Sequence, residues 1–325
     1  MTPGGPGGRP TTDPAMDPVD TAVEVLRAGG LVGLPTETVY GLAADAANEI
    51  AVRRIFAVKG RPADHPLIVH VAVAADLGHW AASVPPSAAA LADACWPGPL
   101  TLLVPKADHV LSVVTGGRDT VGVRVPAHPL ATAVLTRFGG GVAAPSANRF
   151  GQVSPTTAAH VRDDLGADVD FVLDGGPCPI GVESTIVDCT VDPPQILRPG
   201  GIASEQIEAL LAAASGLDSR ARLAPADGPR RASGMLASHY APRARVELAA
   251  SPAAADARAS ELAAAGLAVD VLDPTRDVVA AAQQLYVWLR DADDRGLDVV
   301  VAVLPAAVGL GHAIRDRLTK AAGLG

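Results

Sequence analysis

Polar side chains gather where the sequence predicts the ends of buried strands, and the first such cluster is Thr36-Glu37-Thr38, directly after the apolar run Leu31–Leu34. A hydroxyl, an acid and a second hydroxyl at a strand exit would point into the crevice in which open α/β sheets bind their ligands. A capped turn explains the same residues equally well, with Thr36 or Thr38 as the N-cap of a following helix and Glu37 supporting that helix. The residues alone leave both interpretations open.

Two cations, Lys59 and Arg61, follow at the end of a predicted helix, in a loop that Pro62 and Pro66 stiffen. The dipole of the helix favours cations at its C-terminus, which is one explanation of their position. Cations held in place by a stiff loop are also what triphosphate binding and chemistry at phosphorus require, so we predict that Lys59 and Arg61 are catalytic. His70 alternates with apolar residues along the next strand, where a lone histidine is usually a core residue.

An arginine stands inside a predicted strand of valines. With a period of two, Thr120, Gly122 and Arg124 share one face of that strand. Burying an unpaired charge is costly, so Arg124 needs an acidic partner. A bidentate carboxylate of a ligand would serve, and so would an internal Asp or Glu.

Small residues surround the next group of polar side chains. Ala144, Ser146 and Asn148 leave room for a ligand and offer it hydrogen-bond donors and acceptors. Ser154-Pro155 is typical of a helix start, with Ser154 as N-cap and Pro155 as the first helical residue. Because a helix N-terminus binds anions, this prediction is compatible with a ligand site.

The last cluster combines Ser184, which precedes one predicted strand, with Arg198, which ends the next. Together the clusters supply cations, hydroxyls and a buried arginine, without a Ser-His-Asp order or a metal-ligand cluster. The phosphate-binding and hydrolase signatures GxxxxGK[ST], GxGxxG after a strand, HExxH and GxSxG do not occur. This inventory favours binding a polyphosphate and a small zwitterion over hydrolysis by a protein nucleophile.

Alternating strands and helices must position these clusters. Strands are predicted at Leu31–Leu34, Leu67–Val71, Leu100–Val104, Val121–Val125, Phe171–Leu173, Ile186–Asp188 and Gln195–Arg198. Helices are predicted at Val19–Ala28, Asn48–Lys59, Ser87–Cys95, Pro129–Phe138, Thr157–Leu165 and Ser204–Ala214. Asn48 suits an N-cap and Gly60 suits the position after a helix end. The mixture predicts an α/β layer fold.

A Pro-, Gly- and Arg-rich segment separates this region from a second pattern. Strands at Val246–Leu248, Leu267–Leu272 and Val299–Leu304 alternate there with helices near 253–265, 277–291 and 309–322. This order predicts a small parallel sheet with right-handed crossovers. We therefore expect four regions: a disordered tail at 1–16, a large α/β domain at 17–212, a linker at 213–245 and a small α/β domain at 246–325.

Composition limits the classes of function. The chain has 325 residues and a net charge of −9, which argues against stable binding along a nucleic-acid backbone. Its three cysteines have no CxxC spacing, which fits a reducing compartment better than a disulfide framework. The sequence shows neither a secretory signal nor an apolar run of the roughly 20 residues that span a bilayer. We expect a cytoplasmic protein.

Seven motifs, in order, resemble those of YrdC-like threonylcarbamoyl-AMP synthases. They cover about residues 17–212 and are Thr36-Glu37-Thr38-Val39-Tyr40-Gly41, Lys59-Gly60-Arg61-Pro62, Pro66-Leu67-Ile68-Val69-His70, Trp96-Pro97-Gly98-Pro99, Arg124-Val125-Pro126, Ala144-Pro145-Ser146-Ala147-Asn148 and Gly181-Val182-Glu183-Ser184-Thr185. The segment Gly234–Pro242 resembles the linker of the family's two-domain form. The end of the chain, from Gly309 to Arg317, fits the second domain of that form.

The resemblance implies a fold and a reaction. The fold is a twisted, open, mixed sheet with a concave, positively charged cavity, followed by a smaller Rossmann-like parallel α/β domain. The reaction makes threonylcarbamoyl-AMP and pyrophosphate from L-threonine, bicarbonate and ATP with Mg²⁺. A partner transferase then moves the threonylcarbamoyl group to adenosine in tRNA, so the link to tRNA is indirect.

The resemblance also implies roles for matching positions. The residues that would hold ATP or the adenylate are Lys59, Arg61, Thr120, Ser146, Asn148, Ser154, Arg198 and Tyr240. Those that would line the threonine side are Thr36, His70, Arg124, Ala144 and Ser184, with Arg124 pairing the threonine carboxylate. His239 and Tyr240 would reach back from the linker to close the cavity, and no side chain is assigned as a metal ligand.

The linker departs from the family pattern, because Ser233 stands where a proline is usual and Leu236 where a basic residue is usual. Two other functions fit some of these observations. A carbamoyltransferase that makes carbamoyl-adenylate shares the YrdC-like domain, but such proteins carry an acylphosphatase-like region and paired zinc-ligand cysteines that this sequence lacks. An RNA- or nucleotide-binding module without turnover would use the basic cavity alone, against which the net charge and the scarcity of aromatic residues argue.

Overall fold

A mixed sheet of ten strands forms the centre of the larger domain. The computed structural model describes residues 16–214, 222–223 and 240–324, and the strand order is β10-β9-β8-β4-β5-β3-β6-β2-β1-β7. The strands are β1 Val32–Leu34, β2 Gly41–Asp45, β3 Ile68–His70, β4 Leu100–Pro105, β5 Thr120–Arg124, β6 Val142–Ala143, β7 Phe171–Val172, β8 Thr185–Asp188, β9 Gln195–Arg198 and β10 Arg222–Leu223. Parallel pairs such as β3 with β5 alternate with antiparallel pairs such as β4 with β5, which confirms the predicted mixed α/β sheet.

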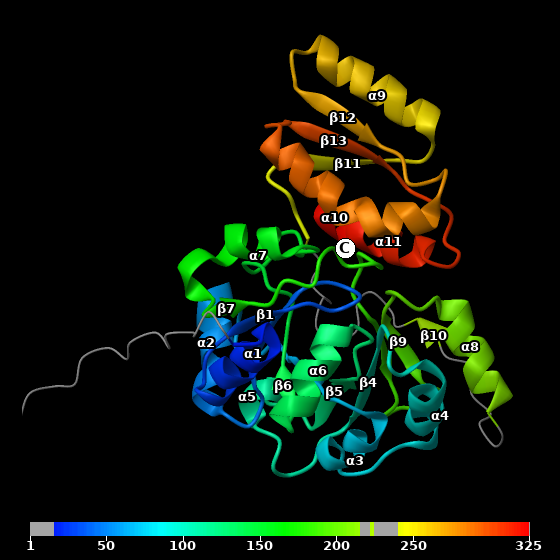
Figure 1. Ribbon diagram of the computed structural model, residues 1–325. Coiled ribbons are helices and arrows are strands. Elements are labelled where there is room, and N and C mark those ends of the chain that lie inside the picture. Colours follow the sequence, from blue (N-terminus) through cyan, green and yellow to red (C-terminus); the bar gives the residue numbers. More distant parts are fainter. Residues whose placement is uncertain (1–15, 215–221, 224–239, 325) are drawn as a thin grey trace, which may run out of the picture.

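Helices cover the sheet on both sides (Figure 1). They are α1 Pro18–Arg27, α2 Glu49–Lys59, α3 Leu77–Trp80, α4 Pro86–Cys95, α5 Ser112–Thr115, α6 Pro129–Phe138, α7 Ala158–Leu165 and α8 Ser204–Ala213, with 3-10 turns η1 Ala74–Asp76 and η2 Gly166–Asp168. Asn48 caps α2 by accepting a hydrogen bond from the Ala51 amide at 3.2 Å, and Gly60 ends it with φ +64°. Both predicted ends of this helix are therefore confirmed, and Arg61 follows it directly.

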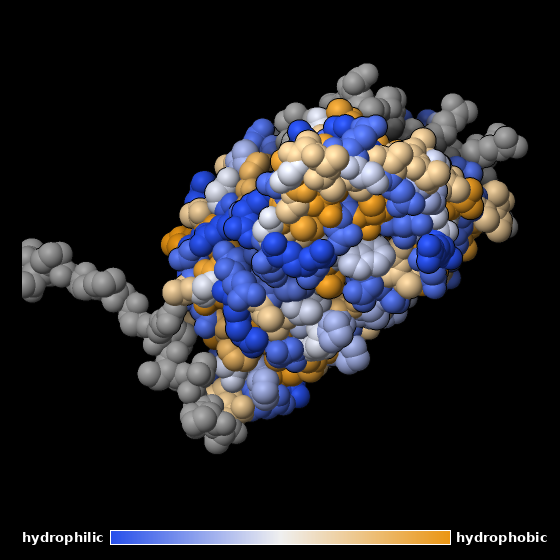
Figure 2. Space-filling view, turned by 90° about the horizontal axis from the view of Figure 1, so that it is seen from above, coloured by the Kyte–Doolittle hydropathy of each residue, from blue (hydrophilic) through white to orange (hydrophobic). Residues whose placement is uncertain are grey.

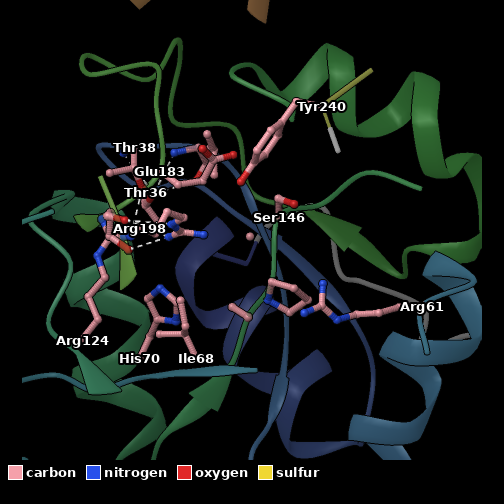
Figure 3. Close-up of a pocket in the computed structure, with 15 residues that line it drawn as sticks. Thr36, Thr38, Arg61, Ile68, His70, Arg124, Ser146, Glu183, Arg198 and Tyr240 are labelled. Atoms are coloured by element: carbon pink, nitrogen blue, oxygen red, sulfur yellow. Dashed lines mark hydrogen bonds between the residues drawn. The ribbon is translucent and has the colours of Figure 1, made fainter. Parts of the chain in front are cut away.

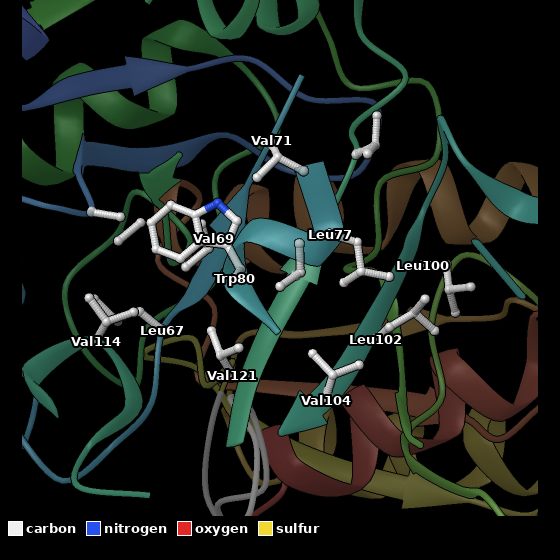
Figure 4. Close-up of a cluster of buried hydrophobic side chains, with 14 of the residues drawn as sticks. Leu67, Val69, Val71, Leu77, Trp80, Leu100, Leu102, Val104, Val114 and Val121 are labelled. Atoms are coloured by element: carbon white, nitrogen blue, oxygen red, sulfur yellow. The ribbon is translucent and has the colours of Figure 1, made fainter. Parts of the chain in front are cut away.

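Aliphatic side chains fill the space between sheet and helices. Leu67, Val69, Leu100 and Leu102 pack in one cluster with Trp80 (Figure 4). Strands with both faces buried need apolar residues at consecutive positions instead of an alternating pattern. This is why runs such as Leu100–Val104 stand out in the sequence.

A second, smaller sheet is parallel throughout, in the order β11-β13-β12. Its elements are β11 Arg245–Ala249, α9 Pro252–Ala264, β12 Val269–Leu272, α10 Val278–Asp294, β13 Val299–Val303 and α11 Gly311–Ala321. The predicted β-α-β-α-β-α order is confirmed. Helices α10 and α11 lie on the side toward the large domain, and α9 lies on the opposite side (Figure 1).

The outer face of the small domain mixes hydrophilic and hydrophobic residues, as the view from above shows (Figure 2). None of the helices in the described part of the chain is both long and apolar enough to cross a membrane.

The predicted tail lies outside the described residues except for Met16, and so does most of the predicted linker. Of that linker, Arg222–Leu223 forms β10 and pairs with β9.

Two helix starts that the sequence left open as interpretations do not occur. Thr36 and Thr38 do not begin a helix, because the chain continues into β2; instead the Thr36 hydroxyl closes a turn by donating to the Val39 carbonyl at 2.6 Å. Ser154-Pro155 does not begin a helix either. Helix α7 begins at Ala158, and Thr157 is its N-cap, accepting from the His160 amide at 3.2 Å.

The cap at the start of α2 gives a test of the fold. Asn48→Ala removes the side chain that satisfies the Ala51 amide, so we expect the free energy of unfolding to fall by about 1 kcal/mol. Urea denaturation measures the change. Ile50→Ala, at an exposed position on the same helix, is the control and should stay within about 0.5 kcal/mol of the wild type. Equal losses in both variants would show that Asn48 has no capping role.

Candidate active site

A cavity opens where the loops after several strands of the large sheet converge, and Tyr240 lies above it. Its lining is Thr36, Thr38, Val39, Gly41, Arg61, Ile68, His70, Arg124, Ala144, Pro145, Ser146, Glu183, Ser184, Arg198 and Tyr240. In Figure 3 the Thr36, Arg124 and His70 side chains lie on one side, Arg61 lies on the other, and Tyr240 lies above. The structure thus brings together residues from all the polar clusters of the sequence.

Arg124 at the end of β5 has an internal acidic partner. Its Nη2 donates to Glu37 Oε1 at 2.6 Å, its Nη1 donates to the Thr38 hydroxyl at 2.9 Å, and its Nε donates to the Gly98 carbonyl at 3.2 Å. Glu37 also accepts from the Ala127 amide at 3.0 Å. Of the two partners that the sequence left open, the structure supplies the internal glutamate, and the guanidinium still lines the cavity.

His70 lies beside Arg124 on the neighbouring strand β3. Burial, and then the charge of Arg124, lower the pKa of this imidazole to about 3. Its Nδ1 is buried and has no hydrogen-bond partner among the described residues. His70 is therefore a neutral imidazole at physiological pH, facing a cavity instead of sitting satisfied in the core.

Ser184 and Arg198 are held together across β8 and β9. The Arg198 Nη2 donates to the Ser184 carbonyl at 2.8 Å and to the Ser184 hydroxyl at 3.1 Å. That hydroxyl also shares a hydrogen bond with Thr101 Oγ1 at 2.8 Å. The cluster predicted from a hydroxyl before one strand and an arginine ending the next is thus a single connected unit.

Glu183, next to Ser184, accepts hydrogen bonds from three side chains. Its Oε1 accepts from the Ser154 hydroxyl at 2.7 Å, and its Oε2 accepts from the Tyr286 hydroxyl at 2.7 Å and from Arg317 Nε at 2.8 Å. Burial alone would raise the pKa of Glu183, but the charges of Arg317 and Arg198 and these hydrogen bonds outweigh burial and lower the pKa to about 2. The carboxylate is therefore ionised across the physiological range.

The lining carries excess positive charge. Arg61, Arg124 and Arg198 line the cavity, and of the two carboxylates beside them Glu37 pairs with Arg124 and Glu183 with Arg317. Burial lowers the pKa of Arg61 to about 10, which still leaves it protonated at neutral pH. A chain with a net charge of −9 thus concentrates cations at one buried place, as anion binding requires.

Four predicted residues lie outside the lining. Lys59 is buried, and its Nζ donates to the carbonyls of Ser146 and Asn148 at 2.5 Å each. Asn148 in turn donates to the Gln152 carbonyl at 2.8 Å. Ser154 bonds Glu183, and Thr120 lies at the opposite end of β5 from Arg124. Lys59 and Asn148 therefore hold the loop that presents Ser146, and a direct nucleotide contact for these four residues stays a prediction.

Tyr240 comes from the linker and adopts φ +62°, a left-handed backbone that is rare for a tyrosine. Its ring lies 5.7 Å from that of Tyr286, with the Arg317 guanidinium 5.1 Å from its centroid. Tyr240 is thus part of the lining and lies above the cavity (Figure 3), and its role in closing the cavity stays a prediction. Its predicted companion His239 lies outside the described residues.

The sequence did not predict which residues orient the side chains of the lining through hydrogen bonds. Glu37 and Glu183 lie within motifs, but they received no role of their own. A buried arginine inside a strand predicts a carboxylate beside it, so a pairing role for Glu37 could have been predicted. Tyr286 and Arg317 gave no such signal, because they lie more than a hundred residues from Glu183 along the chain.

Two family models together match most of the chain. The Sua5, YciO and YrdC family model, described as "Telomere recombination", matches residues 24–200, and one described as "Threonylcarbamoyl-AMP synthase, C-terminal domain" matches residues 202–323. The threonylcarbamoyl-AMP synthases of Pyrococcus abyssi and Bacillus subtilis are 42% and 40% identical, covering 93% and 96% of this chain and 93% and 94% of theirs. A crystal structure of P. abyssi Sua5 complexed with L-threonine superposes with a TM-score of 0.88 at 40% identity, covering 94% of each chain.

The low pKa of Glu183 predicts how the free energy of unfolding changes as the pH falls. Its pKa falls from an ordinary 4.5 to about 2 on folding, so its stabilisation is present above pH 4.5 and is lost as the pH falls through 2. The loss corresponds to about 3 kcal/mol. Glu183→Gln should therefore lose less stability than the wild type between pH 5 and 2, as urea denaturation at a series of pH values would measure. Parallel curves for the two proteins would contradict this assignment.

Proposed function

The chain belongs to the YrdC-like family of threonylcarbamoyl-AMP synthases in its two-domain form, and we propose that its cavity is where L-threonine, bicarbonate and ATP become threonylcarbamoyl-AMP and pyrophosphate. The protein is an enzyme of the nucleotidyltransferase type. The observation that carries the assignment of the cavity is its two-sided lining. A neutral imidazole and hydroxyls lie beside Arg124 on one side, and Arg61 lies on the other (Figure 3).

The Arg124 side suits an amino acid. The guanidinium of Arg124, oriented by Glu37 and Thr38, would bind the threonine carboxylate through charge-assisted hydrogen bonds. His70, held neutral, would accept a hydrogen bond from an N–H or O–H of threonine. Thr36, Ala144 and Ser184 would complete this side, where small side chains leave space for a methyl group.

The Arg61 side suits a nucleotide. Arg61, together with Arg198 from across the cavity beside Ser184, would stabilise the negative charge of the phosphates, and Ser146 and Tyr240 would line the nucleotide. Lys59 and Asn148 support this side by fixing the Ser146 loop. We keep Lys59, Thr120, Asn148 and Ser154 as predicted nucleotide residues, with Lys59 and Arg61 as the predicted catalytic cations.

The chemistry needs positioning more than it needs a protein nucleophile. Once the threonine ammonium has given up a proton, its free amine attacks the carbon of bicarbonate. Water leaves, taking one hydrogen from the nitrogen, and a carbamate remains on threonine. A carbamate oxygen then attacks the α-phosphorus of ATP, and pyrophosphate leaves. Because the carbamate is unstable in water, a closed cavity with Tyr240 above it protects the intermediate. The cations neutralise charge that develops on the pyrophosphate.

Magnesium would accompany the nucleotide. The described residues contain no group of three or more His, Cys, Asp or Glu side chains that could hold a metal ion. Mg²⁺ is commonly held by substrate phosphates and water with few protein ligands. We therefore propose that it reaches the cavity bound to the ATP phosphates.

The product must pass to a second enzyme. Threonylcarbamoyl-AMP is a mixed anhydride, so a transferase that presents the adenosine of tRNA would consume it. The small-molecule character of the cavity and the net charge of −9 support an indirect link to tRNA. The cytoplasm, where such a transferase meets tRNA, is the compartment that we propose.

One assay tests the proposed reaction. The purified full chain is incubated with ATP, magnesium and ¹⁴C-bicarbonate, with and without L-threonine, and labelled adenylate and pyrophosphate are followed. We expect both products only when threonine is present. Turnover without threonine would instead support carbamoyl-adenylate chemistry, and tight RNA binding without turnover would support a binding module. Either result would overturn the proposal.

The threonine side has its own test. Arg124→Ala should raise the KM for L-threonine by roughly a hundredfold, since it removes a charge-assisted partner of the carboxylate. The Kd for ATP, measured separately by calorimetry, should change by less than about threefold. Glu37→Gln, which leaves Arg124 in place, should have a smaller effect on the KM for threonine. An unchanged KM in Arg124→Ala would show that the arginine is only a structural partner of Glu37.

A further inference from the structure

The hydrophobic core of the small domain includes residues of the large one. Val39, Val153 and Val182 are buried in the same cluster as Leu285 and Tyr286 of α10. Val39 lines the cavity, Val182 precedes the lining residue Glu183, and Val153 precedes Ser154, which donates to Glu183. The small domain therefore packs directly on the loops that carry the site, as Figure 1 shows for α10 and α11.

The backbones of the two domains also touch. A Cβ atom built on Gly181 would lie 2.5 Å from the Ala282 carbonyl oxygen and 2.6 Å from the Gln283 Cα of α10, closer than any side chain allows. On the other side of the same loop, a Cβ on Gly200 would lie 2.3 Å from the Glu183 carbonyl oxygen. The Glu183–Ser184 segment is thus held closely between α10 and the Gly200 turn.

Polar contacts from the small domain reach the lining itself. Arg317 of α11 is fully buried, donates from Nε to Glu183 and donates from Nη1 to the Pro199 carbonyl at 2.9 Å, next to Arg198. The Tyr286 hydroxyl donates to the same Glu183 oxygen. The ring of Tyr240 lies against both the Tyr286 ring and the Arg317 guanidinium.

We propose that Tyr286 and Arg317 are positioning residues of the synthesis site, through which docking of the small domain fixes Glu183 and Tyr240. This rests on the function proposed above. Without these contacts the Glu183 carboxylate would keep the Ser154 hydroxyl as a partner, and the Tyr240 ring would lose two of its neighbours. The small domain thereby acts as a built-in support for the cavity, and the large domain alone lacks a complete site.

Other contacts between the domains lie away from the cavity and provide a control. Glu205 of α8 accepts from the Gly309 amide at 3.4 Å and lies 3.1 Å from His312 Nε2. Neither Glu205 nor His312 lines the cavity. Glu205→Ala therefore weakens domain docking without touching Glu183 or Tyr240.

The first experiment uses no substrate. The chain has three tyrosines, so full-length protein labelled with 3-fluorotyrosine gives three ¹⁹F resonances, assigned with single Tyr→Phe variants. Tyr286→Phe keeps the ring beside Tyr240 and removes only the hydroxyl on Glu183. We expect the Tyr240 resonance to shift or broaden in Tyr286→Phe and in Arg317→Ala, and that of Tyr40, which donates to the Gly176 carbonyl at 2.8 Å, to stay unchanged. A Tyr240 resonance that matches the wild type in both variants overturns the proposal.

The second experiment measures catalysis in the same proteins. We expect kcat/KM for threonylcarbamoyl-AMP formation to fall roughly ten- to a hundredfold in Arg317→Ala, to recover partly in Arg317→Lys, and to stay within about twofold in Glu205→Ala. An equal loss in Arg317→Ala and Glu205→Ala contradicts the proposal, because it shows that docking in general matters and these two residues do not. If the wild type makes no threonylcarbamoyl-AMP, the proposed function fails, but the ¹⁹F spectra still decide the positioning role.

Should Arg317→Ala fail to fold, as shown by loss of the Tyr40 resonance, Tyr286→Phe alone decides. It removes one oxygen atom and leaves the packing intact. A displaced Tyr240 resonance together with a lower kcat/KM then supports the proposal, and wild-type values of both overturn it.

Discussion

The ion pair between Glu183 and Arg317 joins two domains at the place where the cavity is formed. Both side chains are almost completely inaccessible to water, with exposed fractions of 6% and 0%. Removing two charges from water is expensive, and the attraction compensates only when the remaining hydrogen-bonding capacity is satisfied. Ser154, Tyr286, the Asp316 carboxylate and the Pro199 carbonyl supply partners, while Arg317 Nη2 has none among the described residues. Because so many groups contact this ion pair, its geometry is fixed, and the positions of the loops that carry these groups are fixed with it.

The second buried carboxylate follows the same logic inside the large domain. Glu37 orients Arg124 from behind, as Glu183 is oriented by Arg317. Each acid pairs with one guanidinium, and Arg61 and Arg198 are further cations of the lining. Fixing the charges before the ligand arrives means that little reorganisation is needed at the moment of reaction, which is how preorganised sites lower a barrier. An acidic protein can therefore bind polyphosphate without a basic surface.

Much of the fold was predictable because it depends on local signals. Asn48 and Gly60 bound α2 through cap chemistry that the sequence states directly, and Leu100–Val104 is too apolar to lie anywhere but in a buried strand. Strand β2 was missed because Gly41-Leu42-Ala43-Ala44-Asp45 has low intrinsic β-propensity and is a strand only through its neighbours. Ser-Pro is common at helix starts, but the helix predicted from Thr157 is capped by Thr157 itself, and the Ser154 hydroxyl donates to Glu183 instead. The site's members were predictable from motifs, but the pairing of Glu183 with Arg317 was not, since nothing local relates two residues so distant in sequence.

Gly181 has a consequence for how these two domains can be recombined. Because the backbone of its loop touches the backbone of α10, the domains meet there without side chains that could adapt to one another. A chimera that joins the large domain of one relative to the small domain of another must therefore reproduce this backbone distance, whatever residues surround it. Side-chain differences elsewhere in the interface can be absorbed by repacking. The two domains are thus exchangeable only together, as a pair taken from one protein.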